Sequence, residues 1–119
     1  MDNDKMAEMQ MIEYQIRQMQ QILENIDAQL NEVSSTKDAL GEFGALKGTE
    51  EAFFPLANGI FVKGRLSDSK LVRMNIGSNV VVEKTIADAI IMMEKQYSEM
   101  NEYREQLVKQ LNDLMQKVQ

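Results

Sequence analysis

The sequence predicts an α+β fold in which a long antiparallel coiled-coil hairpin is joined by two β-hairpins that assemble into an intersubunit β-barrel. Apolar residues recur at helical spacing along residues 1–40 and again along 85–119. Between them, residues 41–84 turn to Val, Ile and Phe, punctuated by tight-turn signals. We expect one domain of 119 residues with two coiled-coil arms, and a central linker with two β-hairpins for oligomerisation.

The first arm carries one long heptad seam, in which apolar residues recur at alternating steps of three and four. The seam positions are Met9, Ile12, Ile16, Met19, Leu23, Ile26, Leu30, Val33, Lys37 and Leu40. A period of about 3.5 residues held over this length favours a left-handed two-helix seam over a broad globular face. Gly41 follows the last position and predicts the end of the helix, which we place at about residues 4–40.

The second arm is predicted to begin at Thr85, because its hydroxyl suits an N-cap and Asp88 follows in the first turn. Its seam positions are Ile86, Ile90, Met93, Tyr97, Met100, Arg104, Leu107, Leu111, Leu114 and Val118. The polar seam residues Lys37 and Arg104 allow two interpretations. They specify register or partner, or their aliphatic stems pack in the seam while the charges reach water.

The two arms have nearly equal predicted lengths of roughly 50–55 Å at about 1.5 Å per residue. Because a compact connection joins them, we expect them to pair antiparallel, with residue 9 meeting residues near 115. The two chain ends would then lie together at a distal tip.

The centre contains four short strand candidates, at residues 52–57, 60–66, 71–76 and 79–84. Asn58-Gly59 predicts the turn of the first hairpin, because both positions tolerate positive φ. Gly77-Ser78-Asn79 predicts the second turn, and Ser67-Asp68-Ser69 links the hairpins. The alternation of apolar and polar residues indicates half-buried strands with one apolar face. Pro55 fits an edge or a bulge.

Two short hairpins cannot build a core of their own, and a two-helix seam offers little to cover them. Their apolar faces and open edges must therefore meet other copies or related chains. The residues expected in this oligomerisation surface are Phe54, Ile60, Val62, Leu66, Val72, Met74, Ile76 and Val81.

The composition excludes several classes of function. The chain has no Cys and no His, which removes disulfides, a thiol nucleophile, the usual zinc ligands and the commonest general base. It also lacks a phosphate-binding glycine loop, so we expect no enzyme, no cofactor and no metal site. The acidic arms argue against nucleic acid, and no apolar run is long enough to span a membrane. We expect a cytoplasmic protein.

The stretch "FFPLANGIFVKGRLSDSKLVRMNIGSNVVVEKTIADAI", residues 53–90, resembles the alpha-type subunit of prefoldin, and an archaeal one more than a eukaryotic one. The resemblance spans essentially the whole chain, since two hairpins between helical arms are typical of the alpha type. It implies a hexamer of two alpha-type and four beta-type subunits with a double β-barrel body and projecting coiled coils. It also implies an ATP-independent co-chaperone that holds unfolded proteins at the coiled-coil tips and delivers them to a group II chaperonin.

The chain ends carry residues suited to such client binding, because methionine adapts to many apolar partners. The candidates are Met6, Met9, Met11, Ile12, Leu111, Leu114, Met115 and Val118. Five of them are seam positions that ordinary helix pairing would also explain, whereas Met6, Met11 and Met115 fall off the seam. An alternative function uses the same hairpins to build a self-assembling scaffold or filament.

Overall fold

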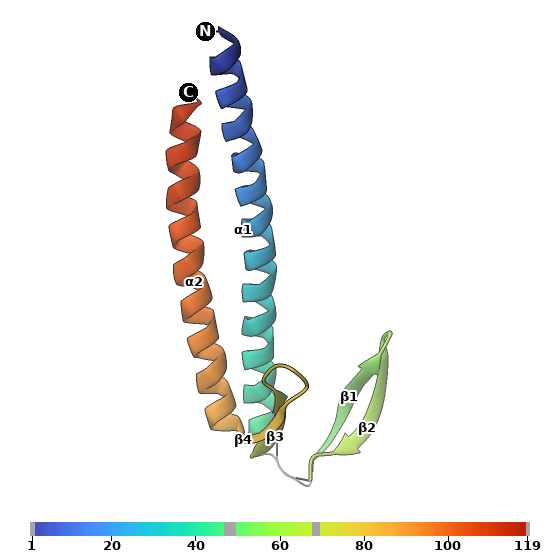
Figure 1. The fold of residues 1–119 in the computed structure, drawn as a ribbon. Coiled ribbons are helices and arrows are strands. Elements are labelled where there is room, and N and C mark those ends of the chain that lie inside the picture. The colour runs from blue at the N-terminus through green and yellow to red at the C-terminus, as the bar shows by residue number, and fades with distance from the viewer. Residues whose placement is uncertain (1, 47–49, 68–69, 119) are drawn as a thin grey trace. The chain divides into compact units, whose positions relative to one another are not determined.

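The computed structural model describes residues 2–46, 50–67 and 70–118. Within them the elements are α1 (Asp2–Ala45), β1 (Glu51–Ala57), β2 (Ile60–Arg65), β3 (Leu71–Asn75), β4 (Val81–Thr85) and α2 (Ile86–Lys117) (Figure 1). The two long helices and two antiparallel hairpins confirm the predicted α+β class, while the barrel stays a prediction. The predicted Ser67–Ser69 link lies partly outside the described residues. The chain divides into a helical unit, Met1–Ser34 with Lys95–Gln119, and a hairpin unit, Ser35–Glu94.

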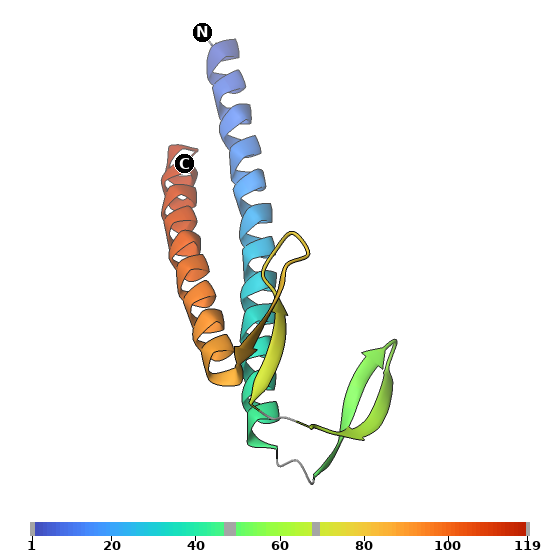
Figure 2. The same ribbon diagram turned by 60° about the horizontal axis from the view of Figure 1, so that its bottom comes forward.

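The helical unit is an antiparallel pair formed by α1 and α2, as two views of the ribbon show (Figures 1 and 2). Ile26, Leu30 and Leu107 are buried together at its centre, with Leu23 and Met100 packed against them. Most other predicted seam positions of the unit are half-buried, while residues between them are mostly exposed. The heptad seam is therefore confirmed, and it supplies the apolar core of this unit.

The register of the pair differs from the one expected from equal arm lengths. The Arg104 Nε lies 2.6 Å from Asp27 Oδ1, and Leu114 shares a groove with Gln15 and Met19. Residues near 115 therefore lie opposite the 15–19 stretch, and the expected pairing with residue 9 is wrong. The helices are in fact unequal, at 44 and 32 residues, so the assumption of equal arms does not hold.

The predicted end of the first helix at Gly41 is also wrong, because α1 continues to Ala45. Gly41 is not among the glycines with positive φ. It lies within the helix, where glycine costs about 0.5–1 kcal/mol of stability relative to Ala. The extra turn carries Phe43, whose ring stacks on Phe54 with centroids 5.7 Å apart. Aromatic pairs contribute about 0.5–1.5 kcal/mol beyond buried area, which offsets the glycine.

The first hairpin forms much as predicted, with Asn58 and Gly59 at positive φ of 51° and 77°. Phe54 pairs with Val62, and the register shifts between Pro55 and Ala57. This irregularity confirms the expected place of the proline, which lacks the N–H that a regular ladder needs.

The second hairpin pairs Met74 with Val82, and its turn is longer than predicted. The Ile76 N–H donates to the Val80 carbonyl at 2.9 Å, while Ser78 and Asn79 adopt positive φ of 50° and 62°. Those two residues cannot extend a strand, so β4 begins at Val81 and not at residue 79.

The start of α2 confirms the predicted cap. The backbone N–H of Asp88 donates to Thr85 Oγ1 at 3.1 Å, which satisfies one of the free donors of the first turn. The N–H of Ile86 donates to the carbonyl of Lys70 at 2.7 Å. The first bond links the end of β4 to the first turn of α2, and the second links that turn to the residue before β3.

Candidate functional sites

The first candidate surface is the chain-end part of the helical unit. Met6, Met9, Met11 and Met115 are exposed there. The exposed fractions of Met6 and Met11, 59% and 66%, are among the highest of the apolar side chains on the helices. Ile12, Leu111, Leu114 and Val118 are half-buried. Met9 occupies a seam position yet is 44% exposed. The tip methionines, by which we mean Met6, Met9, Met11 and Met115, are thus available for contact.

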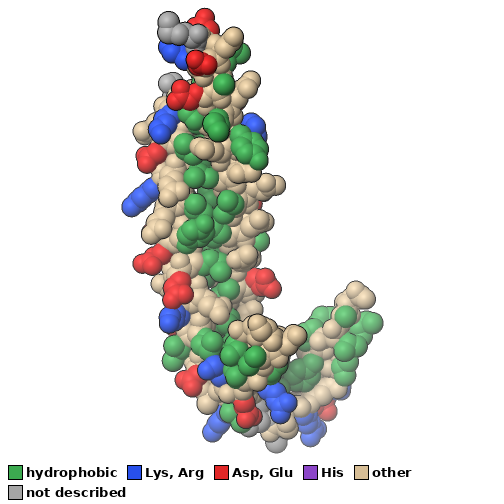
Figure 3. Space-filling view, in the orientation of Figure 1, with side chains coloured by type: hydrophobic (Ala, Val, Ile, Leu, Met, Phe, Trp, Pro, Cys, Tyr) green, Lys and Arg blue, Asp and Glu red, His purple; other side chains and the backbone are tan. Residues whose placement is uncertain are grey.

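A groove lies next to this surface between the two helices of the helical unit. We call it the seam groove; its volume is about 490 Å³. It is lined by Gln15, Gln18, Met19, Ile22, Gln110, Asp113 and Leu114. Figure 3 shows hydrophobic side chains following the line between the helices. Of the predicted client-binding residues only Leu114 lines it. The off-seam Ile22 among glutamines was the signal that could have identified this site.

The second candidate surface is formed by the hairpins. Among the predicted oligomerisation residues Ile60, Val62, Ile76 and Val81 are exposed, while Phe54, Leu66, Val72 and Met74 are half-buried. Phe53, Leu56 and Phe61 are also exposed, at 66%, 69% and 59%, although the sequence pattern did not single them out. Apolar side chains of this size are therefore open to solvent along most of the hairpin unit's strands.

The strand registers place these side chains on both faces of the first hairpin. Phe54 and Val62 are cross-strand partners, so they share one face, while Phe61 pairs with Pro55 on the other. Phe53 alternates with Phe54 and belongs to the second face. The expectation of one apolar face per strand is therefore wrong for this hairpin. In the second hairpin, the face with Val72 and Met74 is half-buried and the one with Val81 is exposed.

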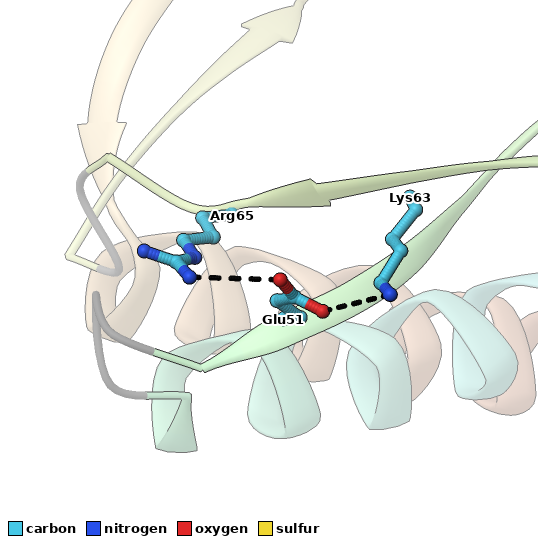
Figure 4. A network of polar contacts seen from close by, with 3 residues as sticks. All are labelled: Glu51, Lys63 and Arg65. Atoms are coloured by element: carbon cyan, nitrogen blue, oxygen red, sulfur yellow. Dashed lines mark ion pairs between the residues drawn. The ribbon is translucent and has the colours of Figure 1, made fainter.

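An ion-pair network lies on the face of the first hairpin that carries Phe53 and Phe61. The carboxylate of Glu51 contacts Lys63 Nζ at 2.9 Å and Arg65 Nη2 at 3.5 Å (Figure 4). The three side chains are 49–61% exposed, so each pair contributes at most about 1 kcal/mol. The network neutralises part of the basic centre and ties the open ends of β1 and β2 together.

The backbone edges of the strands add to this surface. Each hairpin is a separate two-stranded sheet in the described part of the chain. One edge of every strand therefore has no strand partner within those residues. Such edges pair readily with strands of another chain.

The polar seam residues form ion pairs between the helices. Lys37 Nζ lies 3.9 Å from Glu94 Oε1, and Arg104 hydrogen-bonds to Asp27. This hydrogen bond to the Asp27 carboxylate raises the pKa of Arg104 above its ordinary value. The side chain of Arg104 is 37% exposed, and its charge is paired with Asp27. A role in choosing register or partner stays a prediction.

The described residues contain neither a cluster of potential metal ligands nor a helix that could span a membrane. No group of three or more acidic side chains there is placed to hold a metal ion. Neither α1 nor α2, as far as it is described, has the length and hydropathy needed to cross a bilayer.

Comparison with known proteins agrees with this architecture. The family model for the prefoldin subunit matches residues 12–119. Prefoldin subunit alpha of Archaeoglobus fulgidus is 26% identical over 98% of this chain and 85% of its own length. Prefoldin subunit alpha 1 of Thermococcus kodakarensis is 29% identical over 82% of this chain and 70% of that protein.

Among solved structures, the cryo-EM structure of filamentous PFD from Methanocaldococcus jannaschii aligns with a TM-score of 0.81. It covers 92% of this chain and 90% of that one at 16% identity, so this likeness concerns the fold. Because the family match covers nearly the whole chain and includes both helices and both hairpins, this chain belongs to the prefoldin family, and the curated relatives it resembles are alpha subunits.

Proposed function

We propose that this chain is the alpha-type subunit of an ATP-independent co-chaperone that captures unfolded proteins at its helical tips. In this proposal it assembles with beta-type subunits, two alpha to four beta, in the cytoplasm and delivers clients to a group II chaperonin. Membership of the prefoldin family supports the co-chaperone role. The observation that carries client capture is the exposure of the tip methionines.

The physical argument starts from the side chain of methionine. It is unbranched and polarizable, so it fits irregular apolar partners without a fixed geometry. A surface built from it binds weakly and broadly, as recognition of many unfolded sequences requires. Several tips acting on one client convert these weak contacts into useful avidity.

The test replaces Met6, Met9 and Met11 together with Gln, which keeps side-chain length and helix propensity but removes the apolar surface. The assembled complex is then titrated into an aggregating client without nucleotide. We expect the variant to need several-fold more complex for the same suppression. The matched control replaces Ile91 and Tyr103 with Gln in the same way. These helical positions lie outside the tip and are about as exposed as the three methionines, so the control should behave like the unmodified complex. Equal suppression by the two variants would refute capture at the tip.

Assembly through the hairpins is supported by their two-sided apolar exposure and open edges. Val81 is 57% exposed, so Val81→Asp has little effect on the folding of the isolated hairpin. We expect it to block complex formation, because an assembly would bury the new charge without a partner. Ile91→Asp is the control on a helix. An unchanged elution volume of the Val81→Asp complex in size-exclusion chromatography would contradict this surface.

A self-assembling filament is the second candidate, favoured by the same open edges and by the filamentous form of the fold neighbour. Size-exclusion chromatography of the chain alone and with a beta-type partner separates the two candidates. Closure to one discrete species with the partner supports the co-chaperone. Open polymers that persist with the partner support the scaffold.

A further inference from the structure

The methionines of this chain are divided by exposure in a regular way. The sequence has ten of them and no cysteine, so they carry all of its sulfur, and the structure describes every one except Met1. The four exposed ones are the tip methionines. The other five are buried or half-buried and lie in the seam, in β3 and in the first turns of α2: Met19, Met74, Met92, Met93 and Met100. Every exposed thioether of the described chain therefore belongs to the tip.

The same division decides how easily a small oxidant reaches each sulfur. Met93 is only 8% exposed, and Met100 packs against the buried cluster of the helical unit. A solute in water reaches such a side chain only when the surrounding structure opens locally. Met6 and Met11 are reached without any opening, because most of each side chain already lies in water.

A hydroperoxide oxidises a thioether by transfer of one oxygen atom. A lone pair of the sulfur attacks the terminal peroxide oxygen, the O–O bond breaks as the S–O bond forms, and the proton on the attacked oxygen passes to the leaving oxygen. The sulfur is oxidised by two electrons to the sulfoxide, and hydrogen peroxide is reduced to water. The step uses no catalytic group of the protein, so exposure selects the residue. Methionine sulfoxide reductases reverse it.

Oxidation at the tip changes the surface of the chain without a cost to its fold. Four of the five large apolar side chains exposed in residues 2–14 and 111–118 are methionines, and the fifth is Tyr14. A sulfoxide is polar, so oxidation removes most of this apolar surface. The new S–O groups remain in water and need no partner in the folded chain. The pairing of the helices is therefore retained.

We infer that the tip methionines are a reversible oxidation site, which hydroperoxides convert to sulfoxides ahead of the other methionines that the structure describes. The modification makes the tip polar and lowers its capture of unfolded proteins. Reduction of the sulfoxides restores capture. The consequence for capture rests on the proposed function, whereas the selectivity of oxidation rests only on the fold, so the two parts are tested separately.

The first experiment measures selectivity. The full chain is treated with hydrogen peroxide for increasing times, the reaction is stopped with catalase, and tandem mass spectrometry of proteolytic peptides gives the sulfoxide fraction at each methionine. We expect the tip methionines to react at least about ten-fold faster than Met93 and Met100, which corresponds to a local opening free energy of about 1.4 kcal/mol. Circular dichroism should show unchanged helix content after oxidation of the tip.

The control for selectivity is the same reaction in urea that unfolds the chain, where all methionines should react at similar rates. Equal rates in the folded chain would overturn the inference. A ten-fold preference that persists in urea would overturn it too, because the preference would then come from local sequence and not from the fold.

The second experiment measures the consequence. The chain is oxidised only at the tip, freed of peroxide and assembled with untreated beta-type subunits, so that no other methionine of the complex is modified. We expect several-fold more complex to be needed to suppress client aggregation, and methionine sulfoxide reductase should restore the original value. The matched control carries Met6→Leu, Met9→Leu, Met11→Leu and Met115→Leu. Leucine is apolar and has a similar helix propensity, but it has no sulfur, so peroxide treatment should leave suppression by this variant unchanged.

The outcomes separate this inference from the proposed function. An equal loss of suppression in the treated Leu variant would assign the effect to other methionines and overturn the inference. It would also be overturned if the oxidised chain kept full suppression while the variant with Gln at Met6, Met9 and Met11 lost it, and capture at the tip would then stand. If neither oxidation nor the Gln substitutions changed suppression, capture at the tip would be refuted together with the consequence inferred from it.

Discussion

The burial of the seam changes along the helical unit, and this gradient gives a quantitative test. At the centre, Leu30 is 6% exposed, and toward the chain end Met9 occupies the same kind of position at 44%. Replacing each residue with Ala removes apolar atoms from very different environments. We therefore expect Leu30→Ala to lower the free energy of unfolding far more than Met9→Ala.

The magnitude follows from the atoms removed. Leu→Ala deletes three carbon groups, and at about 0.8 kcal/mol for each buried CH₂ the transfer loss is about 2.4 kcal/mol. Only two helices bound the seam, so the side facing solvent can collapse and the additional cavity cost is small. The expected loss is about 2.5 kcal/mol, near the lower end of the range for core Leu→Ala changes. For Met9→Ala we expect less than about 1 kcal/mol, because nearly half of the side chain is already in water.

Urea unfolding followed by circular dichroism at a fixed protein concentration measures both values. With a slope of about 1–3 kcal/mol per molar urea, Leu30→Ala should move the midpoint down by about 0.8–2.5 M. Leu and Met have similar helix propensities relative to Ala, so propensity does not explain a difference between the variants. Equal shifts for the two variants would refute the view that the seam is tight at its centre and open at its end.

Three further predictions concern single local features. Gly41→Ala should raise the free energy of unfolding by about 0.5–1 kcal/mol, because no other part of the described chain comes within 4 Å of the added Cβ; a lower urea midpoint would contradict this. Thr85→Ala should cost about 1 kcal/mol by removing the cap on the Asp88 N–H, whereas Thr85→Ser should restore most of it in the same assay. Asp27→Arg and Arg104→Asp should each lower the melting temperature, and the double exchange should recover it; an additive loss would show that the pair has no specific role.

Local patterns predicted most of the secondary structure. The heptad seam identified both helices, and the hydroxyl of Thr85 marked the start of α2 within one residue. Asn58-Gly59 located the first turn, because its positive φ values are intrinsic to those residue types. Each of these features depends on residues close together in the sequence, and for that reason a single chain was sufficient to find it.

The predictions were wrong for features that depend on contacts between residues far apart in the sequence. Gly41 is a common helix stop, but contact between Phe43 and Phe54 draws the helix one turn further. The register of the helices brings Asp27 and Arg104 together, although they lie 77 positions apart in the sequence. No local pattern states which of several heptad registers is chosen, because a shift of seven residues again aligns apolar positions.

The candidate sites were predicted unevenly for the same reason. Met6, Met11 and Met115 are exposed, as expected for residues off the seam, whereas Met9 is exposed although it occupies a seam position. The seam groove depends on which part of α2 lies opposite Gln15 and Gln18. Its position could be known only after the register was corrected.

The two exposed apolar surfaces of this chain differ in the chemistry of their side chains, and that difference separates their proposed roles. The hairpins present Val, Ile and Phe on strands whose register is fixed by ladder pairing. Branched and aromatic side chains have few rotamers, so they fit one complementary partner well and others poorly. The tip presents Met on a helix, where several rotatable bonds adapt to different partners at modest affinity. The sequence therefore places shape-specific contacts where a permanent assembly is proposed, and adaptable contacts where transient clients are proposed.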